Sequence, residues 1–465
     1  MSLAVSRPAG EEYPRAAEAV SAHPSRSADA ATVIAILTTL QFVLPSRLVL
    51  NGIPLSLAPA TVVALILGAL WLATQCSMTL GAAKGRNPVR TALFVYCVVL
   101  VAAFGSSSAS YLPPDERHIG THALVIMFSL IFVALAVCDG VRGRDRIYFV
   151  LHVIVACGAV MAAVGVIQYL FGFDLTSHAR PPGMHFTEIG SAIGSRDGRN
   201  RASGTAANPL EFGVVCAMVL PLALHCTLAA AKKGSPTRLW WSCVALILAG
   251  LAFSVSRSAI IALLCAAAVL VLGWPARRRV RMIVAGAGFL VVIKVVSPGL
   301  LGTFLSLFEH AGSDDSVQWR THDYATARQL ISLHPWLGRG IGTWYAPKHE
   351  VFDNQYLLTM VDSGLAGLAA LLLVFAAAVY ATIRVRSLAA DRGVAATAGR
   401  LDRDLALSLM ASLVVIFPAF GTFDFVAFPT VTTLAFLLAG LAGALLRTAG
   451  SEAADELAAE PVMRP

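Results

Sequence analysis

Apolar segments that recur along almost the whole chain constrain its fold more than any other feature. One transmembrane helix needs about 20 apolar residues, and twelve segments approach this length: 30–46, 56–75, 90–107, 120–138, 147–171, 208–230, 239–255, 258–274, 281–298, 362–383, 404–420 and 427–446. Only 13% of the residues are charged, against about 25% in a soluble domain. In lipid, backbone hydrogen bonds must be satisfied within the protein, which favours helices. We therefore expect an all-α polytopic membrane protein with about 12 transmembrane helices.

Basic residues indicate how these segments are oriented, because Lys and Arg concentrate on cytoplasmic loops. With a cytoplasmic N-terminus and strict alternation, the inner loops and tails hold 23 of the 35 basic residues, and each short inner loop holds at least three. Two long segments, 172–207 and 297–361, then lie outside. We expect both termini in the cytoplasm. We attribute the net charge of +8 to this membrane bias and not to nucleic-acid binding.

Two polar ends flank one predicted transmembrane domain at 30–446. Residues 1–29 have no apolar core and are therefore no signal peptide; their Pro, Ser, Ala and Glu content predicts a disordered cytoplasmic tail. Residues 447–465 are expected to form a second cytoplasmic tail. The eight cysteines lie in or beside apolar segments and form no CxxC pair, which is typical of small apolar fillers.

Two arginines on the predicted outer side are candidates for anion binding. Arg201 precedes Asn208 and Pro209, which suit the N-cap and first turn of a helix, and a helix start attracts anions. The alternative is an interfacial arginine that meets lipid headgroups. Arg257 is a single cation between two apolar segments, and a charge at the centre of a membrane helix costs roughly 2.5–3.5 kcal/mol. It therefore faces a cavity or a partner, or it snorkels to the interface.

The polar stretch from Trp319 to Gly367 interrupts the apolar pattern and is the first place to look for chemistry. Its beginning has apolar residues at helical spacing, which predicts an amphipathic helix over 319–333 on the outer surface. Arg320 lies on this helix. The stretch as a whole is expected to form a lid whose second half leads into the tenth apolar segment.

His334 and Pro335 end the predicted helix, because Pro cannot continue a helix and restricts the residue before it. Gly338 and Gly340 follow and allow a close backbone approach to a neighbouring group. His334 is a candidate catalytic base, and a purely structural histidine is the alternative. For the glycines, the alternative is a tight turn that closes the lid.

The Asp353-Asn354 pair precedes the tenth apolar segment. A carboxylate at the membrane–water boundary can act as a general base for a hydroxyl group. It can also cap a helix or pair with Arg320. We predict no metal and no cofactor, since the Asp-Asp pair at 314–315 lacks a third ligand at suitable spacing and the acidic motif at 401–404 falls on the predicted cytoplasmic side.

These clusters stand in an order that resembles the O-antigen ligase and O-antigen polymerase superfamily of membrane glycosyltransferases. An R-x-x-G segment precedes an Asn-Pro helix start, a Ser-Arg junction follows, and the outer segment then carries HPxxGxG and a D-N-x9-G-x-x-G motif. The resemblance covers residues 30–446 and is carried by these positions: Arg201, Gly204, Asn208, Pro209, Ser256, Arg257, Arg320, His334, Pro335, Gly338, Gly340, Asp353, Asn354, Gly364 and Gly367.

The resemblance implies a GT-C-like fold in the bacterial plasma membrane, with an outward-facing site under a long external loop that contains short helices. The donor would be an oligosaccharide on polyprenyl (undecaprenyl) diphosphate, and the acceptor a hydroxyl of a glycan or lipid-glycan in surface polysaccharide biosynthesis. Transfer would be inverting and independent of metal. By resemblance, Arg201 and Arg257 hold the diphosphate with Arg320 as a third arginine, and Asp353 is the base. Supporting positions are Asn354, Gly338 and Gly340.

One residue of this chain departs from the family pattern, and two other functions are alternatives to glycan transfer. Ligases of the family carry His where this chain has Asp353, and Asp, with a reference pKa of about 3.9, is a weaker base unless its surroundings raise that pKa. A polymerase or a ligase for another surface glycan is therefore at least as compatible as a lipopolysaccharide ligase, and His334 or His322 are alternative bases.

A transporter or flippase for a lipid-linked sugar would show broken helices near the midplane, whereas polar residues here concentrate at the outer face. A structural scaffold leaves the external arginines unexplained.

Overall fold

The computed structural model describes residues 29–52, 55–76, 86–109, 112–179, 181–187, 193–196, 199–296, 299, 302, 315–345, 348–349, 352–391 and 397–459. Only the backbone is described for residues 195–196, 199, 315–323, 391, 397–398, 400 and 454–459. The predicted N-terminal tail lies outside the described residues except for Asp29, and so does most of the first part of the long outer segment.

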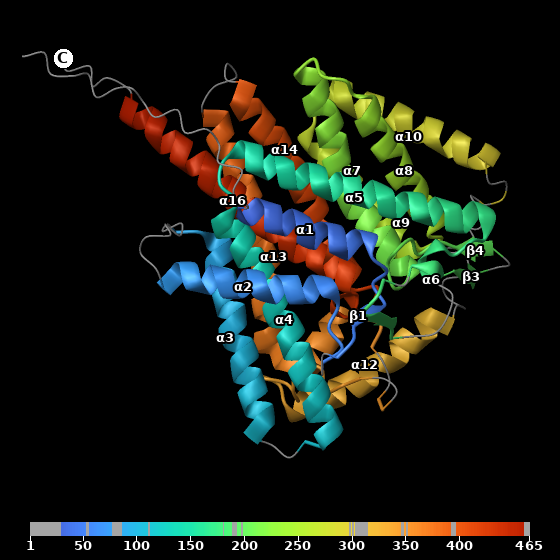
Figure 1. The fold of residues 1–465 in the computed structure, drawn as a ribbon, viewed down its shortest axis with the longest axis vertical. Coiled ribbons are helices and arrows are strands. Elements are labelled where there is room, and N and C mark those ends of the chain that lie inside the picture. The colour runs from blue at the N-terminus through green and yellow to red at the C-terminus, as the bar shows by residue number, and fades with distance from the viewer. Residues whose placement is uncertain are drawn as a thin grey trace, which may run out of the picture.

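Each predicted apolar segment coincides with a helix (Figure 1). The helices are α1 (Ala30–Val43), α2 (Pro59–Cys76), α3 (Pro88–Ala109), α4 (Pro114–Gly140), α5 (Arg144–Phe171), α7 (Pro209–Lys232), α8 (Arg238–Phe253), α9 (Arg257–Gly273), α10 (Ala276–Val296), α13 (Gln355–Asp391), α14 (Thr397–Val414) with α15 (Ile416–Phe420), and α16 (Pro429–Ala459). The last helix continues into the predicted C-terminal tail. An all-α architecture is therefore confirmed.

Eight of the described helical segments are long and apolar enough to cross a bilayer: α2, α3, α4, α5, α7, α13, α14 with α15, and α16. The apolar helices α1, α8 and α9 are shorter than 18 residues. Helix α10 is long enough to cross a bilayer. The four arginines in its first turns make it more highly charged than the eight candidate spans. The polytopic membrane class is thus supported, while the count of twelve crossings stays a prediction.

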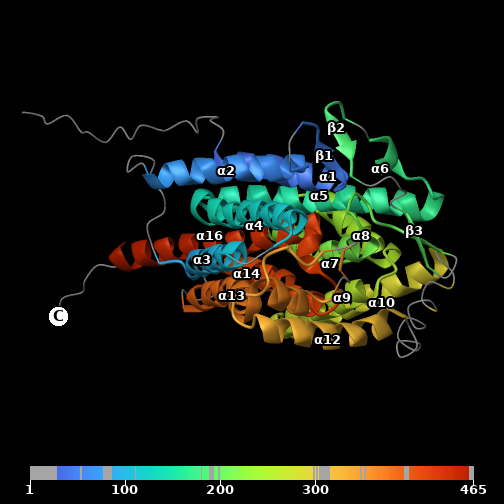
Figure 2. The ribbon, with the colours of Figure 1, turned by 90° about the horizontal axis from the view of Figure 1, so that it is seen from below.

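Short elements connect the helices. Strand β1 (Leu48–Leu50) pairs antiparallel with β2 (Met184–Phe186), and β3 (Gly194–Arg196) pairs with β4 (Arg199–Arg201). The remaining short elements are α6 (Leu175–His178) and the 3-10 turn η3 (Phe425–Ala427). The predicted amphipathic helix is present as α12 (Asp315–Leu333), and it packs against α13. In Figure 2 the strands lie at the opposite end of the helix bundle from the point where the chain leaves α16.

The loops with many arginines and lysines gather at one end of the bundle, which we call the basic end. Ion pairs join these loops to one another: Arg146 to Asp29 (2.7 Å), Arg90 to Asp139 (3.4 Å), Arg144 to Asp402 (2.5 Å), and both Lys232 (2.7 Å) and Arg278 (3.2 Å) to Asp404. All these residues lie at helix ends that strict alternation places on one side. The structure therefore agrees with the alternation, and the basic end is the one predicted to face the cytoplasm.

The connections at the other end, the distal end, are also tied together. The Ser46 N–H donates to the carbonyl of Thr205 (2.9 Å), and the Val426 N–H donates to the side chain of Gln355 (2.8 Å). The α1–α2 loop is therefore tied to the α6–α7 loop, and the α15–α16 connection to the start of α13, at the distal end. This is the end at which the predicted site residues stand.

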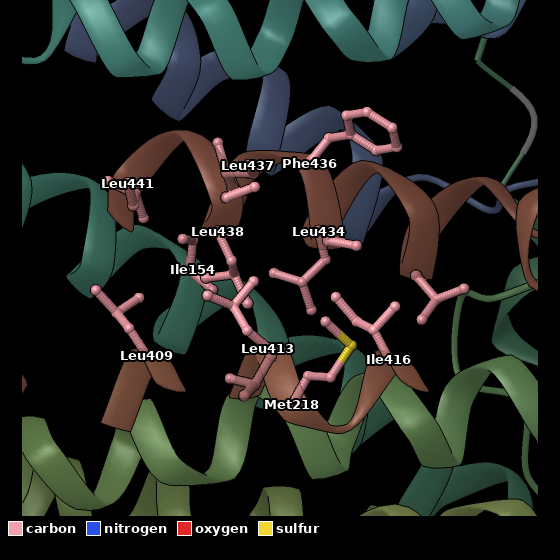
Figure 3. Packing of buried hydrophobic residues seen from close by; sticks show 14 of the residues in the cluster. Ile154, Met218, Leu409, Leu413, Ile416, Leu434, Phe436, Leu437, Leu438 and Leu441 are labelled. Carbon is pink, nitrogen blue, oxygen red and sulfur yellow. The ribbon is translucent and has the colours of Figure 1, made fainter. Parts of the chain in front are cut away.

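Helix α16 forms the centre of the bundle. In its most apolar 18-residue segment, 89% of the residues are buried. Its neighbours include α4, α13, α14 and α7. Figure 3 shows Leu434 and Leu438 of α16 against Leu413 of α14 and Met218 of α7. A helix that is apolar on all sides is expected at such a central position.

Helix α13 is broken near its start, because Gly364 has a left-handed backbone (φ 68°) inside the helix. The segment that follows α12 runs against this break. Backbone hydrogen bonds join the two: Arg339 N–H to Val361 O (2.8 Å), Gly340 N–H to Asp362 O (3.0 Å), Leu365 N–H to Pro335 O (2.9 Å) and Ala366 N–H to Trp336 O (3.2 Å). The HPxxGxG motif is thereby fixed to the start of α13.

Two glycines make this contact possible. A Cβ atom at Gly364 would lie 2.3 Å from the carbonyl carbon of Trp336, and a Cβ at Gly338 (φ 70°) would lie 2.4 Å from that of Asp362. Both distances are far below van der Waals contact, and both glycines have a φ that L-residues avoid. The spacing of glycines in the motif is therefore required by the approach of two backbones.

We expect Gly364→Ala to destabilise the protein by at least about 2 kcal/mol, since the left-handed backbone and the clash with Trp336 add up. Thermal unfolding of the purified protein in detergent measures the effect. Gly288→Ala in α10 is the matched control, because no atom lies within 4 Å of its added Cβ. Equal melting temperatures for Gly364→Ala and Gly288→Ala would contradict the proposed backbone contact.

Candidate active site

Two aspartates approach each other at the distal end. Asp353 precedes α13, and Asp424 precedes η3. Asn354 is the N-cap of α13, since its side chain accepts the N–H of Tyr356 (2.9 Å). Burial raises the pKa of the Asp424 carboxyl to about 7, and the negative charge of Asp353 adds to this increase. Asp353 and Asp424, which we call the carboxylate pair, are thus close enough to interact electrostatically, and the Asp424 carboxyl keeps a proton up to about neutral pH.

The Gln355 side chain holds this pair together. Its Oε1 accepts the N–H of Val426 (2.8 Å), and its Nε2 donates to the hydroxyl of Thr359 (2.8 Å). Gln355 directly follows the N-cap of α13, while Val426 stands two residues after Asp424. One buried amide therefore fixes the α15–α16 connection onto the start of α13 and brings Asp424 to Asp353.

Asp424 was not among the residues predicted from the sequence. A signal for it exists, because Asp424 lies in the short polar interruption between the apolar segments 404–420 and 427–446, on the outer side of the predicted alternation. A carboxylate at such a boundary meets the same criterion that selects Asp353. Only the fold shows that the two belong to one site.

Arg201 lies against the junction between α8 and α9. Its Nε donates to the carbonyl of Ser254 (3.3 Å), and the N–H of Ala202 donates to that of Phe253 (3.1 Å). Arg257 is the first residue of α9 and belongs to the same junction. The structure therefore brings the R-x-x-G segment to the Ser-Arg junction, although more than fifty residues separate them in the chain.

The α8–α9 junction is strained and carries a buried hydroxyl. Val255 has a left-handed backbone (φ 44°), which is unusual for a β-branched residue. Ser256 is the N-cap of α9 and is 1% exposed, and its Oγ has no hydrogen-bond partner within the described part of the chain. Strained backbone and an unsatisfied hydroxyl are features that cluster at functional sites.

The start of α7 is capped as the sequence predicts. Asn208 accepts the N–H of Leu210 (2.9 Å), and Pro209 is the first helical residue. Glu211 adds a second cap, since its carboxylate accepts the N–H of Ala207 (2.9 Å). Because these side chains occupy N–H groups of the helix start, a diphosphate would be held here by arginine side chains and less by the helix itself.

The remaining predicted residues have different surroundings. His334 is exposed at the end of α12, where its carbonyl accepts the N–H of Gly338 (3.1 Å). Gly338 and Gly340 have the packing role described above, and their supporting role in binding stays a prediction. Arg320 lies on α12, but its side chain falls outside the described residues, as does that of the alternative base His322.

A buried glutamate fixes the segment that contains Arg339 and Lys348, part of the predicted lid, to the start of α4. Glu116 is 1% exposed and pairs with Arg339 (2.7 Å), Lys348 (2.8 Å) and His349 (3.3 Å). Asp115 beside it pairs with Lys348 as well (2.8 Å). Arg339 and Lys348, two basic residues of the predicted outer side, therefore have local acidic partners. The segment after Gly338 is held by α4 on one side and by the start of α13 on the other.

We expect Glu116→Gln to destabilise the lid, because Arg339 and Lys348 lose the charge that they share. A loss of about 1–3 kcal/mol is expected, below the value for a fully buried pair since both cations are partly solvated. Thermal unfolding and limited proteolysis within 339–349 measure it. Asp115→Asn is the control, since that side chain is 49% exposed and its loss should leave the melting temperature close to that of the wild type. Equal proteolysis of both variants would contradict this role of Glu116.

Comparison with known proteins finds a family likeness over part of the chain. Residues 242–372 match the family model described as O-antigen ligase. The matched segment contains Arg257, Arg320, His334 and Asp353, while Arg201 and Asp424 lie outside it. No curated protein matches the chain. Over residues 242–372 the chain is thus similar to the O-antigen ligases, which confirms its predicted resemblance to the O-antigen ligase and O-antigen polymerase superfamily.

Proposed function

We propose that this protein transfers or polymerises a polyprenyl-diphosphate-linked oligosaccharide onto an acceptor hydroxyl at the outer face of the bacterial plasma membrane. The observation that carries the proposal is the carboxylate pair Asp353–Asp424 at the same end of the bundle as Arg201 and Arg257. The similarity of residues 242–372 to the O-antigen ligases supports glycan transfer in surface polysaccharide biosynthesis. The pair supplies a base, and the arginines supply positive charge for a leaving diphosphate.

The proposed reaction is one direct displacement. A carboxylate of the pair accepts the proton of the acceptor hydroxyl, whose oxygen then attacks the anomeric carbon of the donor. The bond between that carbon and the diphosphate oxygen breaks, and its electron pair leaves with the lipid diphosphate. Arg201 and Arg257, with Arg320 as a third candidate, neutralise the charge that develops there. Attack opposite to the leaving group inverts the anomeric configuration, and no metal ion is required for these steps.

The raised pKa of Asp424 makes its carboxylate a stronger base than that of an ordinary aspartate. A carboxyl with a pKa of about 7 is half ionised at neutral pH and accepts a proton far more readily than an ordinary aspartate. We therefore assign the base to the pair Asp353–Asp424. His334, exposed at the end of α12, is the alternative base. The family match does not favour the alternative of a transporter or flippase.

The proposal includes an orientation. With the basic end in the cytoplasm, both chain ends are cytoplasmic and the distal end faces outward, where lipid-linked glycans are assembled into surface polymers. The helical bundle under an external loop is compatible with a GT-C-like arrangement of about 12 crossings. In this arrangement α12 and the segment up to Asp353 cover the outer face of the site.

Reconstitution tests the function directly. Purified protein in liposomes with a polyprenyl-diphosphate oligosaccharide and an acceptor glycan should release polyprenyl diphosphate and form a longer glycan. We expect Arg257→Gln to lower kcat/KM roughly 100-fold, the size expected for a lost charge-assisted hydrogen bond in a dry site. Arg117→Gln is a matched control, because Arg117 is exposed on α4 at the same end. Failure of the wild-type protein to release lipid diphosphate would exclude the enzyme.

The carboxylate pair predicts a pH dependence. The base must be ionised, so kcat/KM should rise with pH through about 7, the pKa of Asp424, and level off above it. Asp424→Asn should remove this limb and lower the rate by roughly 100-fold or more. In Asp353→Asn, loss of the neighbouring charge should lower the pKa of Asp424. Any remaining rise of kcat/KM with pH should then occur at lower pH. A limb that stays near pH 7 in Asp424→Asn would assign the base elsewhere, with His334→Gln as the next variant.

A further inference from the structure

A cavity of about 320 Å³ lies at the distal end, beside the site described above. Its walls come from α1, α2, α4, the α1–α2 loop and the start of α16. Val426 and Ala427 of η3 form part of the wall, and they follow Asp424 closely in the chain. On another side the wall is formed by Ala207, just before the cap of α7. The cavity therefore adjoins the elements that carry the candidate base and the Arg201 segment.

Arg47 brings a positive charge to this cavity. One guanidinium nitrogen donates to the carbonyl of Ala207 (3.0 Å), which fixes the side chain. Its Nε is buried and has no hydrogen-bond partner among the described residues, and the same holds for the Oγ of Ser46 beside it. No ion pair of Arg47 is found in the described part of the chain, and no acidic residue is among those that line the cavity. Buried donors of this kind are costly unless a ligand satisfies them.

The backbone around Arg47 is held firmly, so the arginine is not a mobile surface residue. The N–H of Ser46 donates to Thr205 O (2.9 Å), and the carbonyl of Arg47 accepts both the N–H (3.0 Å) and the hydroxyl (3.2 Å) of Thr187. The Thr205 hydroxyl in turn donates to Phe42 O (2.5 Å). This preorganisation lowers the cost of binding an anion, because the donors are already in place.

Part of the remaining wall is suited to hydrocarbon. Leu37 of α1, Ala64 of α2, and Ile126, Leu130 and Val133 of α4 line the cavity, together with polar side chains such as Gln41 and Thr433. A guanidinium is the preferred partner of a phosphate group, and the volume is at the lower limit of small-molecule sites. It would accommodate a phosphorylated headgroup with the first carbons of its chain, and not an oligosaccharide.

We propose that the Arg47 cavity is a second binding site for the diphosphate group of a polyprenyl lipid, separate from the site at Arg201 and Arg257. Resting on the proposed function, this inference means that both substrates arrive on lipid diphosphates, the donor at the arginines of the α8–α9 junction and the acceptor at Arg47. Two lipid-linked chains at one carboxylate pair are the substrate set of a polymerase.

Binding stoichiometry tests the second site. The protein is placed in nanodiscs of phosphatidylcholine and titrated with farnesyl diphosphate, a short polyprenyl diphosphate without sugar. The wild type should bind two equivalents, and Arg47→Gln and Arg257→Gln one equivalent each. Thr61→Phe, which narrows the cavity from α2 without removing a bond of Arg47, should also leave one equivalent. Arg117→Gln, on α4 outside the cavity lining, should keep two.

The source of the phosphate is tested with inorganic diphosphate and with farnesol. Both should bind at the Arg47 cavity at least tenfold more weakly than farnesyl diphosphate. Inorganic diphosphate binding as tightly would assign the cavity to a free anion, and a single equivalent in the wild type, lost in Arg257→Gln, would overturn the second site while leaving glycan transfer intact. Conversely, two equivalents with no transfer in liposomes would refute the proposed function and retain the lipid site.

Discussion

The distal end depends on one buried carboxylate, that of Glu211 in the first turn of α7. It is fully enclosed and accepts the backbone N–H groups of Ala207 (2.9 Å), Thr430 (2.6 Å) and Val431 (3.1 Å). A carboxylate without such bonds is too costly to bury, and the N–H groups of a helix start need an acceptor. Each requires the other, so the starts of α7 and α16 are fixed side by side. The loops before these helices carry Arg201 and Asp424, so the Glu211 contact ties these two loops to each other.

Around this centre, each further candidate group is attached by a contact of its own. The side chain of Gln355 brings the start of α13 to η3, and Arg47 reaches the loop before α7 through Ala207. The lid segment is held by Glu116 on one side and by the glycine contact at Gly364 on the other. Hydrogen bonds and charges thus arrange the site, whereas apolar packing around α16 holds the helices. A substitution at the distal end can therefore impair chemistry while the bundle stays folded.

The helices could be predicted because their apolar runs are set by the bilayer itself, and local rules also identified the Asn208 cap and the helix stop at Pro335. Those rules cannot show which helix ends meet, so Asp424, Glu211 and Arg47 were missed: each acts through partners distant in sequence. For the glycines of the HPxxGxG motif, the sequence predicted part of the structural role. Their close approach was predicted, but the group that they approach is the backbone of α13, which only the fold reveals. The count of crossings rested on hydropathy and on the alternation of basic loops, and it is least secure at α10 because of the arginines in that helix.

The central position of α16 has a consequence for how the protein is made. A chain emerges from the ribosome N-terminus first, and its parts begin to fold in that order. Among the candidate membrane spans of the described chain, α16 is the most buried, and it follows α4, α7 and α13 in the sequence, so these three helices keep exposed contact surfaces until α16 has been made. Only then does Glu211 find the N–H groups of Thr430 and Val431. The loop that carries Asp424 is therefore fixed to the start of α7 only after α16 has been synthesised, later than the helices that surround it.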